Sequence, residues 1–193
     1  MGFLTGGFAA RSPWLIHYDG SSCNGCDIEV LDCLTPLYDI ERFGIINTGN
    51  PKHADIFLVT GSVNVQNKAV VQGIYQQMLE PKVVVACGVC ACTGGVFRDC
   101  YNVLGGVDQA IPVDVYAPGC AVRPETIIDA VLEGAKILGE KERRMRAGEL
   151  PAGAGLAGSA GDAAVGGTAG AGVAGSDVAG PAGAESASQG EAA

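Results

Sequence analysis

Eight cysteines are the residues of this 193-residue chain most suited to chemistry, and several stand close together. Cys23 and Cys26 form a Cys-x-x-Cys pair within GSSCNGCDIEV. Three more cysteines lie in the segment CGVCAC, and Cys120 follows a Pro-Gly dipeptide. Thiolates grouped in this way can hold an iron–sulfur cluster or a zinc ion, or can form a redox-active dithiol.

Short apolar segments that alternate with helical patterns must position these cysteines. We expect strands over 14–18, 43–47, 55–61, 82–88 and 112–119. We expect helices over 26–38, weakened near Pro36, and over 70–80 and 123–139. Strands alternating with helices predict an α/β fold, a flavodoxin-like three-layer sandwich with a mostly parallel sheet. In such sheets ligands bind at the carboxyl ends of the strands.

Composition divides the chain into three parts: an N-terminal extension at 1–11, a domain at 12–148 and a tail at 149–193. Gly and Ala dominate the last part, so we expect a disordered, flexible tail. The net charge of -9 without a basic stripe argues against a nucleic-acid partner. We expect neither export nor a membrane span, because no signal-like start or apolar run of about 18–20 residues is present.

Three expected strand ends deliver cysteines to the same edge of the sheet. Cys23 and Cys26 follow the first strand, CGVCAC follows the strand at 82–88, and Cys120 follows the strand at 112–119. Glycines beside them allow sharp turns and close backbone approach, namely Gly20, Gly25, Gly88, Gly94, Gly95 and Gly119. Four thiolates that converge from loops suit a [4Fe–4S] cluster.

Two other types of site remain as alternatives. Structural zinc takes four cysteines, but its pairs usually lie within about 15–20 residues, a spacing that is absent here. A thiol–disulfide oxidoreductase would use Cys23 and Cys26, with Pro112 before a strand, but would leave Cys90 and Cys120 without a role. Spacing alone leaves open which cysteine of CGVCAC is the ligand.

Three segments resemble the small, proximal-cluster subunit of membrane-bound energy-converting [NiFe] hydrogenases and its homologue, the terminal-cluster subunit of respiratory complex I. These segments are SPWLIHYDGSSCNGCDIEVL, CGVCACTGGVF and GGVDQAIPVDVYAPGCAVRPE. The resemblance covers about residues 12–138. It implies one [4Fe–4S] cluster, with Cys23, Cys26, Cys90 and Cys120 as ligands. We expect the cluster to be surrounded by Gly25, Gly88, Gly119 and Arg123.

The spacing of the first cysteine pair favours one branch of this superfamily. Complex I proteins carry two adjacent cysteines there, whereas Cys-Asn-Gly-Cys is the hydrogenase-like form. The resemblance therefore implies a non-catalytic electron-transfer subunit, with the complex I subunit as the alternative. Implied partners are a Ni–Fe-binding large subunit, a ferredoxin-like two-cluster subunit, integral membrane subunits and the donor ferredoxin. The implied location is the cytoplasmic, inner face of the cell membrane, reached through these partners.

Polar residues near the first pair carry further expectations. The resemblance implies that Glu29 lies near the boundary between cluster and active site, where it would relay protons. A first-turn acid that favours the helix dipole is the alternative. Arg123 would pair with the cluster, with a partner carboxylate or with solvent. Asp27 is expected to be an ordinary first-turn acid, and His17 a hydrogen-bonded core or interface residue.

Overall fold

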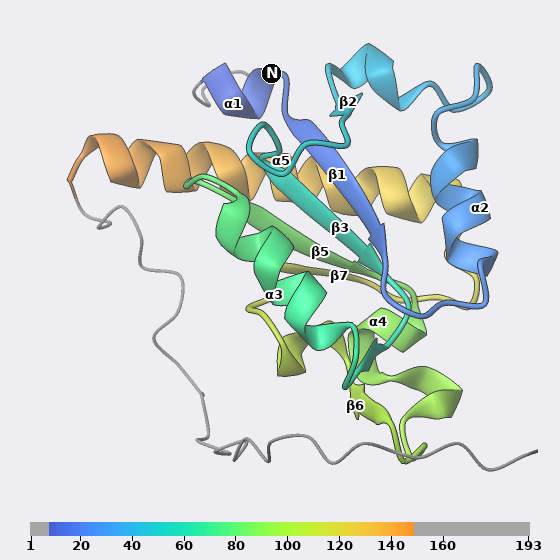
Figure 1. Ribbon diagram of the computed structural model, residues 1–193. Coiled ribbons are helices and arrows are strands. Elements are labelled where there is room, and N and C mark those ends of the chain that lie inside the picture. Colours follow the sequence, from blue (N-terminus) through green and yellow to red (C-terminus); the bar gives the residue numbers. More distant parts are fainter. Residues whose placement is uncertain (1–7, 149–193) are drawn as a thin grey trace, which may run out of the picture. The chain divides into compact units, whose positions relative to one another are not determined.

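A five-stranded parallel sheet forms the centre of the computed structural model, which describes residues 8–148 (Figure 1). Its order is β2-β1-β3-β5-β7, with β1 Trp14–Asp19, β2 Ile46–Asn47, β3 Ile56–Thr60, β5 Val83–Cys87 and β7 Val115–Ala117. Numbered within this sheet alone, the order is 2-1-3-4-5, the flavodoxin-like order. A separate antiparallel pair consists of β4 Val63–Asn64 and β6 Val103–Gly105.

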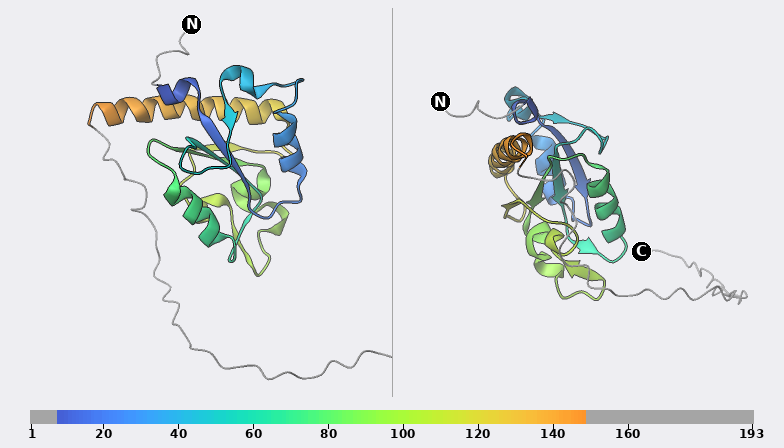
Figure 2. Two further views of the ribbon diagram at one scale, coloured as in Figure 1. Left: turned by 45° about the horizontal axis from the view of Figure 1, so that its top comes forward. Right: turned by 90° about the vertical axis from the view of Figure 1, so that its left-hand side faces the viewer.

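Helices cover both faces of the main sheet (Figures 1 and 2). The α-helices are α1 Phe8–Arg11, α2 Gly25–Asp32, α3 Lys68–Gln77, α4 Val89–Thr93 and α5 Pro124–Arg146. Short 3₁₀ turns occupy Ile40–Phe43, Gly95–Phe97 and Val107–Gln109. Helices α2 and α5 pack on one face, and α3 packs on the other. The predicted three-layer α/β sandwich is confirmed.

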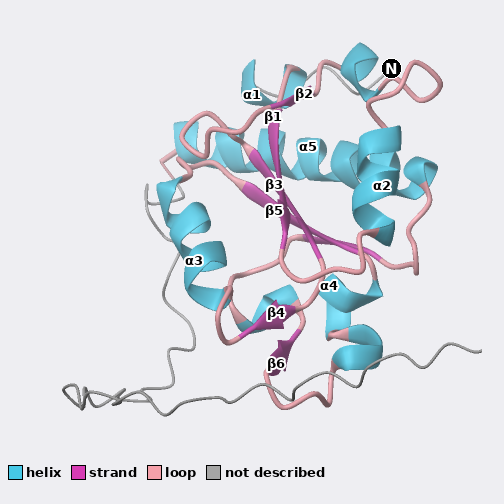
Figure 3. Cartoon of the chain, turned by 45° about the vertical axis from the view of Figure 1, so that its right-hand side comes forward, coloured by secondary structure: helices cyan, strands magenta, loops and turns pink. Residues whose placement is uncertain are grey.

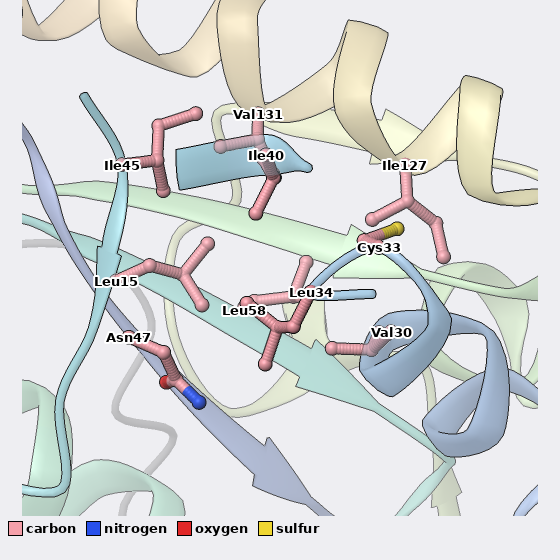
Figure 4. Close-up of a pocket in the computed structure, with 10 residues that line it drawn as sticks. All are labelled: Leu15, Val30, Cys33, Leu34, Ile40, Ile45, Asn47, Leu58, Ile127 and Val131. Atoms are coloured by element: carbon pink, nitrogen blue, oxygen red, sulfur yellow. The ribbon is translucent and has the colours of Figure 1, made fainter. Parts of the chain in front are cut away.

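Alternation along the buried strands builds a core on each face. In β3, Ile56 and Leu58 face α2 and α5, whereas Phe57 and Val59 face α3. All five residues of β3 and of β5 are buried, as expected for strands covered on both sides. The core under α2 and α5 contains a small, mainly apolar cavity (Figure 4), lined by Leu15, Val30, Cys33, Leu34, Ile40, Ile45, Asn47, Leu58, Ile127 and Val131.

Helix α5 runs back along the sheet, opposite to the strands. It begins at Pro124 near the carboxyl edge of the sheet, and proline is well suited to the first turn of a helix. The Pro124 carbonyl accepts a hydrogen bond from the Cys33 thiol. Near its other end, Lys141 Nζ donates to the Lys82 carbonyl at 2.9 Å and to Asp114 Oδ1 at 2.7 Å. Lys82 and Asp114 immediately precede β5 and β7, so α5 ends at the amino edge.

Several boundaries differ from the sequence predictions. The helix predicted over 26–38 ends at Asp32, because the Thr35 hydroxyl bonds to the Asp32 carbonyl and Pro36 follows. The strand predicted over 43–47 keeps only its last two residues, since Gly44 adopts a φ of 84°. The last predicted strand shortens to three residues, and α5 continues seven residues beyond 139.

Two predictions concern the ends of the chain and its relation to a membrane. The predicted flexible tail at 149–193 and most of the predicted extension at 1–11 lie outside the described residues, and residues 8–11 form α1. None of the helices in the part of the chain that the structure describes combines the length and apolar character needed to span a membrane.

Candidate functional site

The four cysteines predicted as ligands lie directly after three strands of the main sheet. Cys23 is exposed in the loop after β1, and Cys26 is half-buried in the first turn of α2. Cys90 is half-buried in α4, just after β5, and Cys120 is exposed between β7 and α5. Figure 1 shows these segments meeting at one end of the sheet. This is the carboxyl edge, beside the β1/β3 switch point at which flavodoxin-like sheets bind ligands.

Cys90 interacts electrostatically with the three other predicted ligand cysteines. Burial raises the pKa of Cys90, and the negative charges of Cys120, Cys23 and Cys26 raise it further. Thiolates this close repel one another, so the group favours a cationic or metal-containing occupant that relieves the repulsion.

Four cysteine thiols form the candidate donor set. Among residues 8–148, no three His, Cys, Asp or Glu side chains are grouped as a site for one metal ion. A [4Fe–4S] cluster usually takes four cysteine thiolates as its ligands. In the type and number of its residues, the donor set fits such a cluster.

Cys26 is the thiol most strongly prepared to act as an anion. A hydrogen bond from Cys87 lowers the pKa of Cys26 against the opposing effect of burial, and a backbone bond from Val122 adds to the lowering, giving a value of about 6. The same contact with Cys26, together with burial, raises the pKa of Cys87. This lowering of the pKa favours the thiolate form of Cys26, the form that binds metal.

Glycines leave room for the sulfur atoms. A Cβ atom on Gly88 would lie 2.7 Å from Cys26 Sγ, and one on Gly95 would lie 3.1 Å from Cys90 Sγ. The Gly88 N–H donates to the Ala117 carbonyl at 2.8 Å, so this glycine supplies space to the site. The backbone hydrogen bond that lowers the pKa of Cys26 comes from Val122.

Two of the other predicted glycines are also close to the site. A Cβ on Gly25 would lie 3.5 Å from Cys23 Sγ, at ordinary van der Waals contact. The Gly119 carbonyl accepts a hydrogen bond from the Val89 N–H at 2.9 Å. This bond ties the start of α4 to the loop that carries Cys120.

The remaining cysteines have other surroundings. Cys33 is buried at the end of α2, and its thiol donates to the Glu29 and Pro124 carbonyls at 3.2 and 3.6 Å. The half-buried Cys92 donates to the Ala86 carbonyl at 3.7 Å. Cys100 is exposed.

Asp27 is the centre of a polar network that sequence reasoning missed. Its Oδ1 atom lies 3.0 Å from His17 Nε2 and accepts a 2.5 Å hydrogen bond from Thr60, while the Ser22 hydroxyl donates to Oδ2. Burial raises the pKa of Asp27, but the bonds from Ser22 and Thr60 and the charge of His17 outweigh burial and lower it. His17 is hydrogen-bonded, as predicted. Asp27 is not an ordinary first-turn acid, because it joins α2 to the ends of β1 and β3.

Thr60→Val is expected to destabilise the protein by about 1–3 kcal/mol, because it removes a buried donor to a carboxylate while keeping the side-chain shape. Urea unfolding followed by circular dichroism measures the change. Thr126→Val, at an exposed position of α5, is the matched control and should alter stability by less than about 0.5 kcal/mol. Equal effects of the two substitutions would contradict a stabilising role for the network.

Glu29 and Arg123 lie near the thiols in different settings. Glu29 is half-buried in α2, and its charge tends to raise the pKa of Cys26. Arg123 is exposed at the residue immediately before α5, three positions after Cys120. The structure therefore brings Glu29 within electrostatic reach of the site.

Comparison with known proteins identifies the family. Residues 23–134, a span that begins at the first predicted ligand cysteine and includes all four, match the family described as NADH ubiquinone oxidoreductase, 20 Kd subunit. The chain belongs to this family. The resemblance inferred from the three cysteine-containing segments is confirmed, and with it the expectation of a non-catalytic subunit of an oxidoreductase complex.

Relatives from both branches of the superfamily resemble the chain. The probable membrane-bound hydrogenase subunit mbhJ of Pyrococcus furiosus is 47% identical over 144 residues, covering 75% of this chain and 84% of that protein. A subunit of the NADH-quinone oxidoreductase of Geotalea daltonii is 42% identical over 132 residues, covering 68% and 75%. A chain of the membrane-bound sulfane sulfur reductase, an archaeal respiratory membrane complex, superposes with a TM-score of 0.60 at 36% identity, covering 69% and 74%.

Proposed function

We propose that this chain is the electron-transfer small subunit of an energy-converting [NiFe] hydrogenase complex, with one [4Fe–4S] cluster held by Cys23, Cys26, Cys90 and Cys120. The convergence of four thiols on the carboxyl edge of the sheet is the observation that carries this proposal. When bound, such a cluster supplies a one-electron carrier.

The residues of the chain prepare the site for an anionic, bulky group. The lowered pKa of Cys26 favours its thiolate form, and the glycines at 88 and 95 leave space beside the sulfur atoms. Helix α4, which carries Cys90, is tied to the loop that carries Cys120 by the hydrogen bond from the Val89 N–H to the Gly119 carbonyl. Preorganised thiolates bind without the cost of ordering the loops.

The hydrogenase branch is favoured by two observations. The Cys23–Cys26 spacing has the hydrogenase-like form, and the match to mbhJ covers more of this chain, 75% against 68% for the Geotalea daltonii relative. A complex I-type subunit is the second candidate. The similarity to a sulfane sulfur reductase chain adds a third complex in which a subunit of this fold occurs.

Exposed apolar side chains on and after two of the helices that carry the thiols support a protein partner. They come from α2 and the turn after it, and from the segment that follows α4, and comprise Ile28, Leu31, Leu37, Val96, Phe97 and Tyr101. Figure 3 shows α2 and α4 on adjoining sides of the same end of the domain. We propose that a Ni–Fe-binding large subunit covers this edge, because large apolar patches mark interaction sites.

Further partners follow from the proposed complex. A ferredoxin-like two-cluster subunit would deliver electrons from ferredoxin, and integral membrane subunits would hold the complex at the inner face of the cell membrane. The chain itself would then be peripheral and cytoplasmic.

Anaerobic purification of the tagged chain from its native host tests the proposal. We expect co-purification of a nickel-containing large subunit and about four iron atoms per copy of this chain. Nickel-free complexes with quinone-dependent activity would favour the complex I alternative. An iron-free protein that reduces insulin disulfides through Cys23 and Cys26 would contradict the proposal.

Glu29→Gln is expected to slow H₂ turnover by about tenfold or more if Glu29 relays protons, because the amide keeps the shape and loses the titrating group. The EPR signal of the reduced cluster should be unchanged. Asp129→Asn is the control, because it also replaces one carboxylate by an amide, at an exposed position of α5. It should leave H₂ turnover unaffected. Turnover equal to wild type in the Glu29 variant would leave Glu29 as a helix-dipole residue.

A further inference from the structure

Cys87 is a buried cysteine at the site that the proposed ligand set does not use. It is the last residue of β5 and is 0% exposed. Its neighbours in the sheet are Thr60 of β3 and Ala117 of β7. The residue therefore ends β5, the strand between β3 and β7, at the carboxyl edge of the sheet that carries the thiols.

The side chain of Cys87 faces the sulfur of Cys26. It belongs to the core under α2 and α5, and Cys26 packs against that same core. The glycine at position 88 allows Cys26 Sγ to approach the backbone beside Cys87, within 2.7 Å of where a Cβ would stand. The Cys87 thiol is therefore placed to share a hydrogen bond with Cys26, an interaction that lowers the pKa of Cys26.

The direction of this hydrogen bond follows from the two environments. A ligand cysteine is deprotonated and has no proton to donate. A thiol enclosed in an apolar core keeps its proton, because burial disfavours the charged form. Cys87 is consequently the donor and Cys26 Sγ the acceptor.

We propose that Cys87 is a positioning residue that donates an S–H hydrogen bond to the ligand sulfur of Cys26 and thereby raises the reduction potential of the cluster. This inference rests on the proposed function. One-electron reduction adds negative charge that the ligand sulfurs share, and a donor to one of them stabilises the reduced form more than the oxidised form.

The other buried or half-buried thiols do not offer this bond. The thiol of Cys33 donates to the Glu29 and Pro124 carbonyls, and that of Cys92 donates to the Ala86 carbonyl. Cys33 therefore provides a control cysteine in the same core whose proton is used by backbone oxygens.

The test is a mediated redox titration of the anaerobically purified complex, followed by EPR. Cys87→Ala and Cys87→Val both remove the donor, and valine also fills the space. We expect each to lower the equilibrium constant for reduction by up to about tenfold, which corresponds to about 59 mV. Cys87→Ser keeps a donor and should restore a potential close to wild type, and Cys33→Ala should leave the potential unchanged.

Several results would overturn the inference while leaving the proposed function intact. These are a wild-type potential in both Cys87→Ala and Cys87→Val, an equal shift in Cys33→Ala, or a serine variant that matches alanine. Iron lost from Cys87→Ala but retained in Cys90→Ala would make Cys87 a ligand and also overturn it. An iron-free wild-type complex would instead contradict the proposed function itself.

Discussion

Cys120→Ser is expected to remove most of the iron and acid-labile sulfide from the purified protein, reducing both from about four per chain to below about one. Cys120 lies on the loop between β7 and α5, and its charge acts on Cys90 across the site. Serine keeps the size of the side chain but replaces a soft thiolate with a weakly acidic hydroxyl. Iron and sulfide assays on anaerobic samples measure the loss.

Two control substitutions make the iron measurement specific. Cys100→Ser removes an exposed thiol from the segment after α4 and should leave the iron content unchanged. Cys92→Ser should also retain iron, whereas Cys90→Ser should lose it as Cys120→Ser does. Iron retained in Cys90→Ser and lost in Cys92→Ser would mean that the third ligand is wrongly assigned.

Gly88→Ala is expected to reduce both the iron content and the stability of the protein, because the substitution strains the backbone and crowds a neighbouring sulfur atom. Gly88 has a φ of 91°, in the region where an alanine costs about 1–3 kcal/mol. The added methyl group would also stand 2.7 Å from Cys26 Sγ and push a ligand sulfur out of position. We therefore expect lost iron and a lower melting temperature.

Gly73→Ala is the matched control for this substitution. Gly73 lies within α3, and nothing would lie within 4 Å of an added Cβ. Alanine is the better helix former, so this variant should gain about 0.5–1 kcal/mol and keep its iron. A Gly88→Ala protein with full iron content and wild-type stability would contradict the close contact between Gly88 and Cys26.

Local sequence patterns were sufficient to predict the strands that lead to the site and the long helix that follows Cys120. Runs of β-branched residues such as VVVAC predict a strand buried on both faces, and β5 is fully buried. Pro124 and the apolar repeat that follows it predict where α5 begins and which residues it buries. The helix continues to Arg146 through charged residues that do not extend the apolar pattern, so the sequence predicts too early an end. The five-residue helix α4 was missed, since its length gives no periodicity and glycines flank it.

The hydrogen-bond partners of Asp27 and Cys26 could not be predicted from the sequence, because they lie far away along the chain. Asp27 was expected to be an ordinary acid, and its donor Thr60 lies 33 positions away on another strand. The partnership of Cys26 with Cys87 likewise depends on how α2 sits over the end of β5. Spacing predicts which strand ends carry thiols, and only the packed structure shows which thiol faces which.

The course of helix α5 has a practical consequence for attaching the protein to a surface. Its 23 residues span about 34 Å at 1.5 Å per residue, from beside the thiols to the opposite end of the sheet. A sensor chip or electrode linked at position 146 by a chemistry that does not use thiols, since Cys23, Cys100 and Cys120 are exposed, would leave the thiol-bearing edge pointing away from the support. Partner docking could then be measured on an oriented layer, whereas direct electron exchange with the support would have to cross the length of the domain.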